Sequence, residues 1–167
     1  MTRRRRGLLS AAAFLAALPA PLAAKDSLGV FSQWGAFRDP AVPRCYAIAM
    51  PQANRGAIEY QAFASVGTWP RRALRNQLHF RLSRRVSPAG RITLRVGNQG
   101  FELTGGGGDA WAKDRQMDAA IVAAMRSAGA MIVTARDRNG KTFNDSYRLT
   151  GAATAMDAAT VGCAKLK

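Results

Sequence analysis

Residues 78–82 read Leu-His-Phe-Arg-Leu, and residues 92–96 read Ile-Thr-Leu-Arg-Val. Apolar and polar side chains alternate in both runs, which is the period of a β-strand with one buried and one exposed face. The turn-forming residues 87–90 (SPAG) separate the runs. This pattern predicts a hairpin with one apolar face and one basic face, the latter carrying Arg81, Arg91 and Arg95.

Further strands are predicted on both sides of this hairpin. Residues 44–50 and 60–66 are apolar on both faces, as central strands are. Residues 97–100 (GNQG) turn the chain into a strand at 101–103. The Asn-Gly within residues 137–140 favours a tight hairpin turn between strands at 131–135 and 141–149.

Two later segments have the period of a helix. The apolar residues of the first are spaced i, i+3, i+4, i+7, i+8 and i+11, and they are Met117, Ala120, Ile121, Ala124, Met125 and Ala128. Asp114 suits its N-cap and Gly129 its end. A second, short helix is predicted from Ala152 to Cys163. The fold class is therefore mainly β, an antiparallel sandwich or open barrel with two short helices packed on it.

The N-terminus has the pattern of an export signal. Arg3 to Arg6 precede an apolar run that ends near Pro19 and Pro21, and small residues up to Ala24 offer a cleavage site. We therefore predict a cleavable signal peptide at 1–24. A retained anchor is disfavoured because the apolar run is shorter than the roughly 20 residues that cross a bilayer.

The charge of the remaining chain is strongly positive. Without the four arginines of the signal, residues 25–167 contain 21 basic and 10 acidic residues, a net charge of +11. Such a charge favours anionic partners such as lipopolysaccharide, phospholipid or glycosaminoglycan. Nucleic acid is a poorer expectation, because export removes the usual nucleic-acid partners. An incidental charge is the alternative.

Cys45 and Cys163 are the only cysteines. One pair in a small exported domain indicates a disulfide, which here closes a loop of more than 100 residues. Two free thiols are the alternative.

The sequence shows little that resembles a catalytic site. His79 is the only histidine, and the spacing of the sequence places no serine or cysteine next to it as a nucleophile. One histidine cannot supply the three or four ligands of a metal site, so no metal and no cofactor are expected. Residues 104–108 (TGGGG) lack the lysine of a phosphate-binding loop and are predicted to be a flexible loop before Trp111. Asp145 shares strand parity with Phe143 and Tyr147, which predicts an inward carboxylate with an arginine or backbone partner.

Arginines near aromatic residues are the best candidates for a binding site. Arginine binds phosphate or sulfate through two parallel hydrogen bonds and stacks on rings. The candidate contacts to an anionic surface are Arg71, Arg72, Arg75, Arg81, Arg91 and Arg95. A solvated sheet face is the alternative interpretation.

Short motifs along the chain suggest a family. Residues 34–37 (WGAF), 45–48 (CYAI), 123–126 (AAMR) and 145–151 (DSYRLTG) form a pattern that resembles the invasion-associated locus B (IalB) family of exported alphaproteobacterial proteins. The resemblance covers about residues 32–163. It implies a single IalB-like domain at 25–167.

The resemblance also implies a non-enzymatic protein, periplasmic or secreted from a Gram-negative cell, with a role in host-cell invasion. It brings no catalytic residues. Its recurrent positions match Trp34, Cys45, Tyr147, Leu149 and Gly151, which we interpret as scaffold. The expected function is binding of an anionic surface or of an envelope or host protein. A structural or stress-related periplasmic factor without a host role is the alternative, and a hydrolase around His79 comes third.

Overall fold

The computed structural model describes residues 25–53, 56, 58–88 and 90–164. The predicted signal peptide at 1–24 lies outside the described residues and stays a prediction. Within the described part of the chain, no helix is long and apolar enough to cross a membrane.

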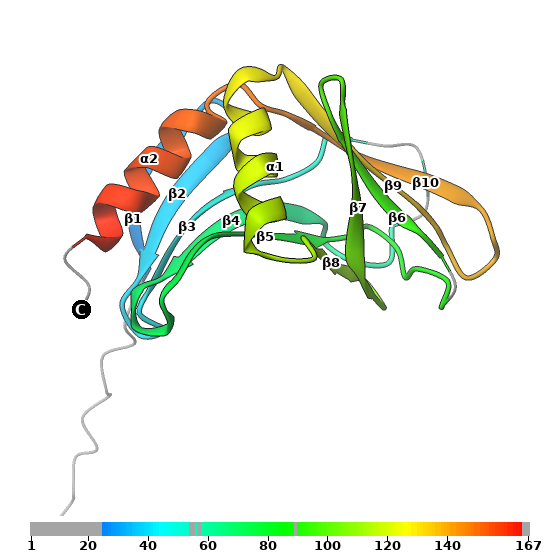
Figure 1. Ribbon diagram of the computed structural model, residues 1–167, viewed down its shortest axis with the longest axis horizontal. Helices are drawn as coiled ribbons and strands as arrows, with labels where there is room; N and C mark the ends of the chain where they lie inside the picture. The colour runs from blue at the N-terminus through cyan, green and yellow to red at the C-terminus, as the bar shows by residue number, and fades with distance from the viewer. Residues whose placement is uncertain (1–24, 54–55, 57, 89, 165–167) are drawn as a thin grey trace, which may run out of the picture.

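Ten strands form one antiparallel sheet, in the order β1-β2-β3-β4-β5-β8-β7-β6-β9-β10. The strands are β1 Asp26–Phe31, β2 Trp34–Asp39, β3 Arg44–Ala49, β4 Phe63–Trp69, β5 Leu74–Arg81, β6 Ile92–Val96, β7 Gln99–Gly106, β8 Asp109–Trp111, β9 Ala130–Arg136 and β10 Thr142–Arg148. The sheet bends strongly between β1–β5 and the group β6, β9 and β10 (Figure 1). It is not closed into a barrel, which confirms the expected mainly β, open architecture.

The hairpin predicted from the two alternating runs is wrong. β5 pairs with β4 and β8, whereas β6 pairs with β7 and β9. Alternation did place the side chains on the correct faces, since Leu78, Phe80 and Leu94 are buried. However, alternation predicts only which side chains of a strand are buried, and it does not predict which strand lies next to it.

The strands that separate β5 from β6 include residues expected to form a loop. β7 extends to Gly106, so the predicted flexible loop at 104–108 is wrong, and only Gly107 and Gly108 form the turn into β8. Gly105 has φ of 156°, and a Cβ atom there would lie 2.2 Å from the carbonyl oxygen of Asp109. Glycine therefore allows β7 and β8 to approach each other at this point.

The other predicted hairpins are confirmed. β6 pairs with β7 across residues 97 and 98, and β9 pairs with β10 across residues 137–141. The two expected central strands are β3 and β4, which pair with each other inside the sheet.

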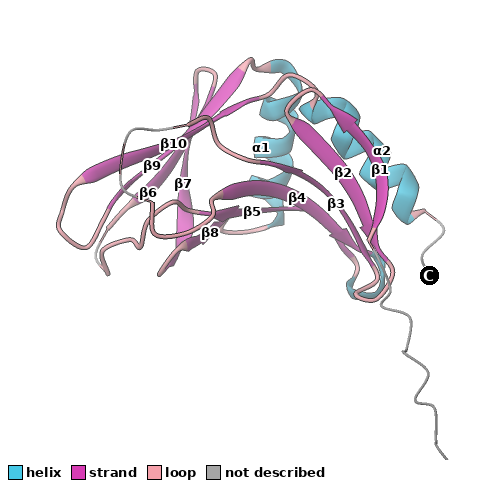
Figure 2. Cartoon of the chain, turned by 180° about the vertical axis from the view of Figure 1, so that it is seen from behind, coloured by secondary structure: helices cyan, strands magenta, loops and turns pink. Residues whose placement is uncertain are grey.

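Both predicted helices are present, α1 at Arg115–Ser127 and α2 at Ala152–Cys163. The Asp114 side chain accepts a hydrogen bond from the Met117 amide at 2.8 Å, as a helix N-cap does. The helices lie on one face of the sheet, in front of the strands in Figure 1 and behind them in Figure 2. α2 packs on β1–β4, and α1 packs on β5 and β6. We call the opposite face of β1–β5 and β8 the outer face.

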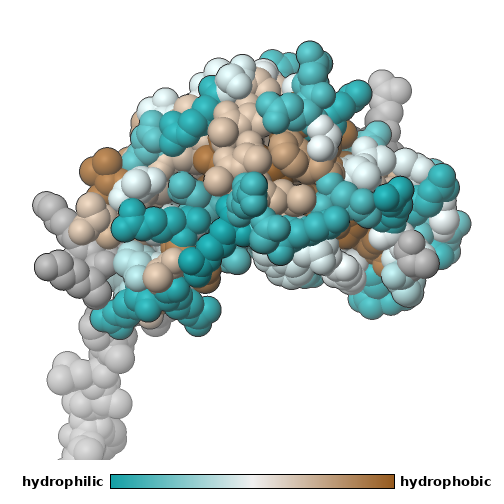
Figure 3. All heavy atoms as spheres, in the orientation of Figure 1, coloured by the Kyte–Doolittle hydropathy of each residue, from teal (hydrophilic) through white to brown (hydrophobic). Residues whose placement is uncertain are grey.

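The core lies between the helices and the inner face of the sheet, which is the face that the helices cover. Its largest fully buried side chains include Trp34, Leu78, Phe80, Met125 and Tyr147. Ile121, Val122 and Met125 of α1 are buried in this core. Ala119, Ala120 and Ala123 are exposed on the solvent side of α1, where apolar colour gathers in Figure 3.

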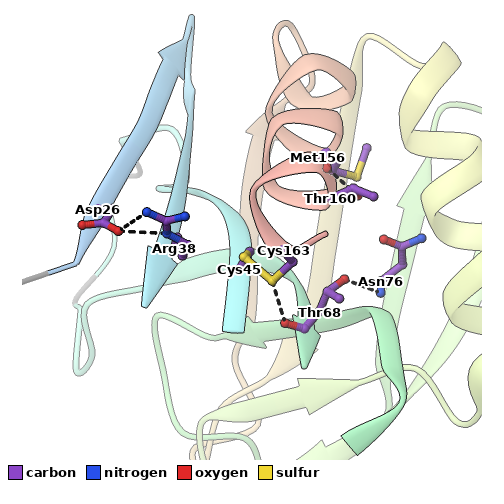
Figure 4. Close-up of a disulfide and its surroundings, with 8 residues drawn as sticks. All are labelled: Asp26, Arg38, Cys45, Thr68, Asn76, Met156, Thr160 and Cys163. Carbon is purple, nitrogen blue, oxygen red and sulfur yellow. Dashed lines mark hydrogen bonds and ion pairs between the residues drawn. A yellow bond between two sulfur atoms is a disulfide. The ribbon is translucent and has the colours of Figure 1, made fainter. Parts of the chain in front are cut away.

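A disulfide joins the sheet to the end of α2. Cys45 of β3 is bonded to Cys163, with a Cα–Cα distance of 5.6 Å and a sequence separation of 118. Figure 4 shows the bond beside Thr68 and Asn76, at the start of the β4–β5 connection. The predicted pairing is confirmed.

Candidate functional site

The structure divides the six predicted arginines into separate places. Arg71 and Arg72 lie in the short 3-10 helix Pro70–Arg72, and Arg75 follows in β5. Arg91 and Arg95 lie at β6, on the other side of β7 and β8. Five of the six are exposed, and Arg81 is partly buried. The arginines therefore do not form the single basic face that the predicted hairpin required.

Arg91 and Arg95 line one shallow hollow of about 590 Å³ on the sheet surface. Thr93, Thr134 and Phe101 also line it. Arg91 makes two hydrogen bonds to Glu102, at 3.2 and 2.9 Å, and this arginine lowers the pKa of the Glu102 carboxyl group. The hollow thus combines two exposed arginines, of which Arg91 is paired with Glu102.

Almost all acidic side chains of the described chain are held by other groups. Six of the ten carboxylates form ion pairs: Asp26, Asp39, Glu102, Asp109, Asp137 and Asp157. Three more accept hydrogen bonds from backbone amides: Asp114, Asp118 and Asp145. Because the acids are engaged in this way, the excess positive charge is borne by exposed arginines and lysines.

The outer face carries a row of rings that the sequence did not predict. Phe37, Tyr46, Phe63, Trp69, His79 and Trp111 point to this side, and we call this surface the ring face. Strand pairing aligns Gly35, Ile48, Ser65, His79 and Trp111 across β2, β3, β4, β5 and β8. With a spacing of about 4.8 Å between strands, this row is about 19 Å long.

Glycines allow several of these rings to lie flat on the sheet. A Cβ atom at Gly35 would be 2.7 Å from the ring of Phe37, and one at Gly67 would be 2.6 Å from the ring of Trp69. Each ring therefore lies directly over the backbone of its own strand. Phe37 also stacks on Tyr46, with a centroid distance of 5.7 Å.

His79 lies at the centre of the most polar part of the ring face. Its ring stacks on Trp111 at 5.0 Å and meets the edge of Phe63 at 5.3 Å. Its Nε2 atom is 3.0 Å from Oδ1 of Asp109, while the other oxygen of Asp109 accepts from Arg81 at 2.5 Å. His79 and Arg81 do share one face, as predicted, but Asp109 neutralises the basic character expected there.

The contacts of His79 also concern the hypothesis of a hydrolase site around this histidine. Ser65 is the cross-strand neighbour of His79, but its hydroxyl lies 3.5 Å from the backbone carbonyl of His79. In the part of the chain that the structure describes, no serine hydroxyl bonds to the histidine ring, so the first contact of a Ser-His-Asp relay is not made here.

No group of three or more potential metal ligands occurs among the described residues. No protein-family model, curated protein or solved structure matches the chain. The resemblance to the IalB family therefore stays an expectation that rests on the quoted motifs.

Sequence reasoning missed the ring face because it missed β8. Asp109 and Trp111 alternate with Ala110, which is the signal of a strand, but three residues next to four glycines are too short a run to distinguish from a loop. The contact between His79 and Asp109 was therefore not predicted.

Proposed function

We propose that this is a non-enzymatic exported protein that binds anionic surfaces of the bacterial envelope or of a host cell. The observation that carries the proposal is the engagement of the acids, nine of which bind a cation or a backbone amide. The net charge of +11 on residues 25–167 is thereby presented to solvent by side chains such as Arg75 and Arg95.

Export is supported by the N-terminal sequence and by the disulfide. A bond between Cys45 and Cys163 is stable in an oxidising compartment such as the periplasm or the cell exterior. In that setting the anionic partners available to the protein are lipopolysaccharide, phospholipid head groups and, outside a host cell, glycosaminoglycans. All of them present phosphate, sulfate or carboxylate groups, which arginine binds well.

The test measures sedimentation of the oxidised protein with phosphatidylcholine vesicles that contain or lack phosphatidylglycerol, and with lipopolysaccharide, over a series of NaCl concentrations. We expect binding only where anionic groups are present, and weaker binding at higher salt. Arg75→Ser and Arg95→Ser should each weaken binding about fivefold, because a basic residue near an anionic bilayer contributes about 1 kcal/mol.

Lys25→Ser serves as a matched control, because it removes one exposed positive charge just before β1, an edge strand that three strands separate from β5. If the three variants weaken binding equally, net charge alone drives it. Binding that responds to neither salt nor arginine replacement would contradict the proposal and favour a structural or stress-related role.

A further inference from the structure

The part of the ring face around Trp111 is built differently from the exposed arginines. It comprises Tyr60, Phe63, His79, Arg81, Asp109 and Trp111, and we call it the Trp111 cluster. These side chains come from β4, β5, β8 and the segment before β4. It combines flat rings with hydrogen-bonding groups in one small area.

Each ring of the cluster is held in place. The guanidinium of Arg81 lies 4.0 Å from the centroid of Tyr60, and Arg85 donates to the Tyr60 hydroxyl at 3.0 Å. Gly108 lies beneath this ring, since a Cβ atom there would be 2.6 Å from Cε2 of Tyr60. The ring is therefore fixed before any ligand arrives, which lowers the entropic cost of binding.

Trp111 is the ring that a ligand can reach. It is 36% exposed, although one of its faces stacks on His79 with an interplanar angle of 12°. About a third of its surface is thus available to a ligand. A large aromatic surface turned to water at the end of a rigid row is the kind of feature that marks a binding site.

The charges inside the cluster cancel. Arg81 and Asp109 form an ion pair in which each side chain keeps about a third of its surface, 30% and 27%. One further cation, Arg85, stands at the rim. A protein with a net charge of +11 beyond its predicted signal therefore has a nearly neutral patch here, and such a patch suits a ligand without charge.

We propose that the Trp111 cluster binds a neutral saccharide. A pyranose ring has an apolar face of C–H groups that packs on the exposed surface of Trp111, and hydroxyl groups around its edge. Those hydroxyls donate to the Asp109 carboxylate and accept from the Arg81 guanidinium, both of which are within the same patch. The row of rings toward Phe37 and Tyr46 gives further sugars a surface to follow.

This inference does not depend on the proposed anionic surface. Electrostatic binding by arginines weakens with salt, whereas stacking and hydrogen bonding to a neutral sugar change little. The two proposals can therefore fail separately.

The experiment titrates the oxidised protein with cellohexaose, the hexamer of N-acetylglucosamine and maltohexaose, with tryptophan fluorescence and calorimetry as readouts. We expect at least one of these neutral oligosaccharides to bind and to quench fluorescence, with little change between low and high salt. Trp111→Ala should weaken that binding about tenfold, as removal of a central aromatic contact does.

Two further variants serve as controls for the loss of binding in Trp111→Ala. Trp111→Phe keeps a flat ring and should retain most of the affinity. Val161→Ala changes an apolar residue of α2 that is 72% exposed, and should leave binding unchanged. Circular dichroism checks that each variant is folded.

Three outcomes would overturn the proposal. They are no binding of any of the three oligosaccharides, equal binding by the wild type and Trp111→Ala, and Trp111-dependent binding of a single-stranded oligonucleotide without any binding of sugars.

Discussion

The inward position of Asp145 was predictable from the sequence, but burial is unfavourable for its charged carboxylate. Strand parity predicted that it points inward and finds a backbone partner, and it does, since Ser83 donates its amide to Oδ2 at 2.8 Å. None of its surface is exposed, and Oδ1 has no hydrogen-bond partner among the residues that the structure describes. Burial raises the pKa of this carboxyl group. The carboxyl group therefore binds a proton more tightly in the folded chain than in the unfolded chain.

Asp145→Asn should stabilise the protein at neutral pH and have less effect in acid. The penalty for the charged form is present above the folded-state pKa, and it vanishes as the pH falls below the unfolded value of about 3.9. Asparagine removes the charge whose desolvation is unfavourable, and the penalty for such a buried group is about 1–3 kcal/mol. Thermal unfolding of both proteins over a pH series measures the difference.

Asp157→Asn is the control with the opposite sign. Arg126 lowers the pKa of Asp157, so the ionised form contributes stability that is lost as the pH falls through the folded pKa. Replacement should therefore destabilise slightly at neutral pH, because exposed pairs contribute little. A lower midpoint for Asp145→Asn at neutral pH would contradict our view of Asp145.

At the scale of elements, the helices were easier to predict than the sheet. The apolar stripe and the Asp114 cap are local signals, and the structure places α1 within two residues of the expected segment. Strand neighbours are set by contacts distant in the sequence, so β5 and β6 were paired wrongly. The ring face depends on the β5–β8 pairing, which joins His79 to Trp111, and on glycines beneath the rings, which no local pattern reveals.

The N-cap of α1 offers a test at this scale. Asp114→Ala removes the acceptor of the Met117 amide and should lower the free energy of unfolding by about 1 kcal/mol. Asp114→Ser keeps a capping oxygen and should lose much less. Urea unfolding of the three proteins provides the comparison, and equal midpoints for the wild type and Asp114→Ala would show that the cap contributes nothing.

At the scale of the molecule, the disulfide ties the sheet to its last helix. The bond spans 118 residues, and the chain-entropy account gives such a loop about 4–5 kcal/mol. The sequence predicted this bond from cysteine count and expected compartment. The bend of the sheet in Figure 1, by contrast, has no local signal in the sequence and could not be predicted.

Replacement of both cysteines by serine should lower the free energy of unfolding by about 2–5 kcal/mol. Guanidinium unfolding measures the loss, and dithiothreitol should produce a similar loss in the wild type. The same reductant should leave the double variant unchanged. Equal stability of the oxidised wild type and the double variant would show that the bond is dispensable for folding.

The position of the disulfide also decides what a single proteolytic cut can do. Every strand from β4 to β10 lies between Cys45 and Cys163. A protease that cleaves one peptide bond in this span leaves two pieces that are still covalently joined. The nicked molecule migrates as one species on a gel without reductant and as two with it. Outside a cell, where proteases are abundant, one cut in a surface loop therefore does not release a fragment.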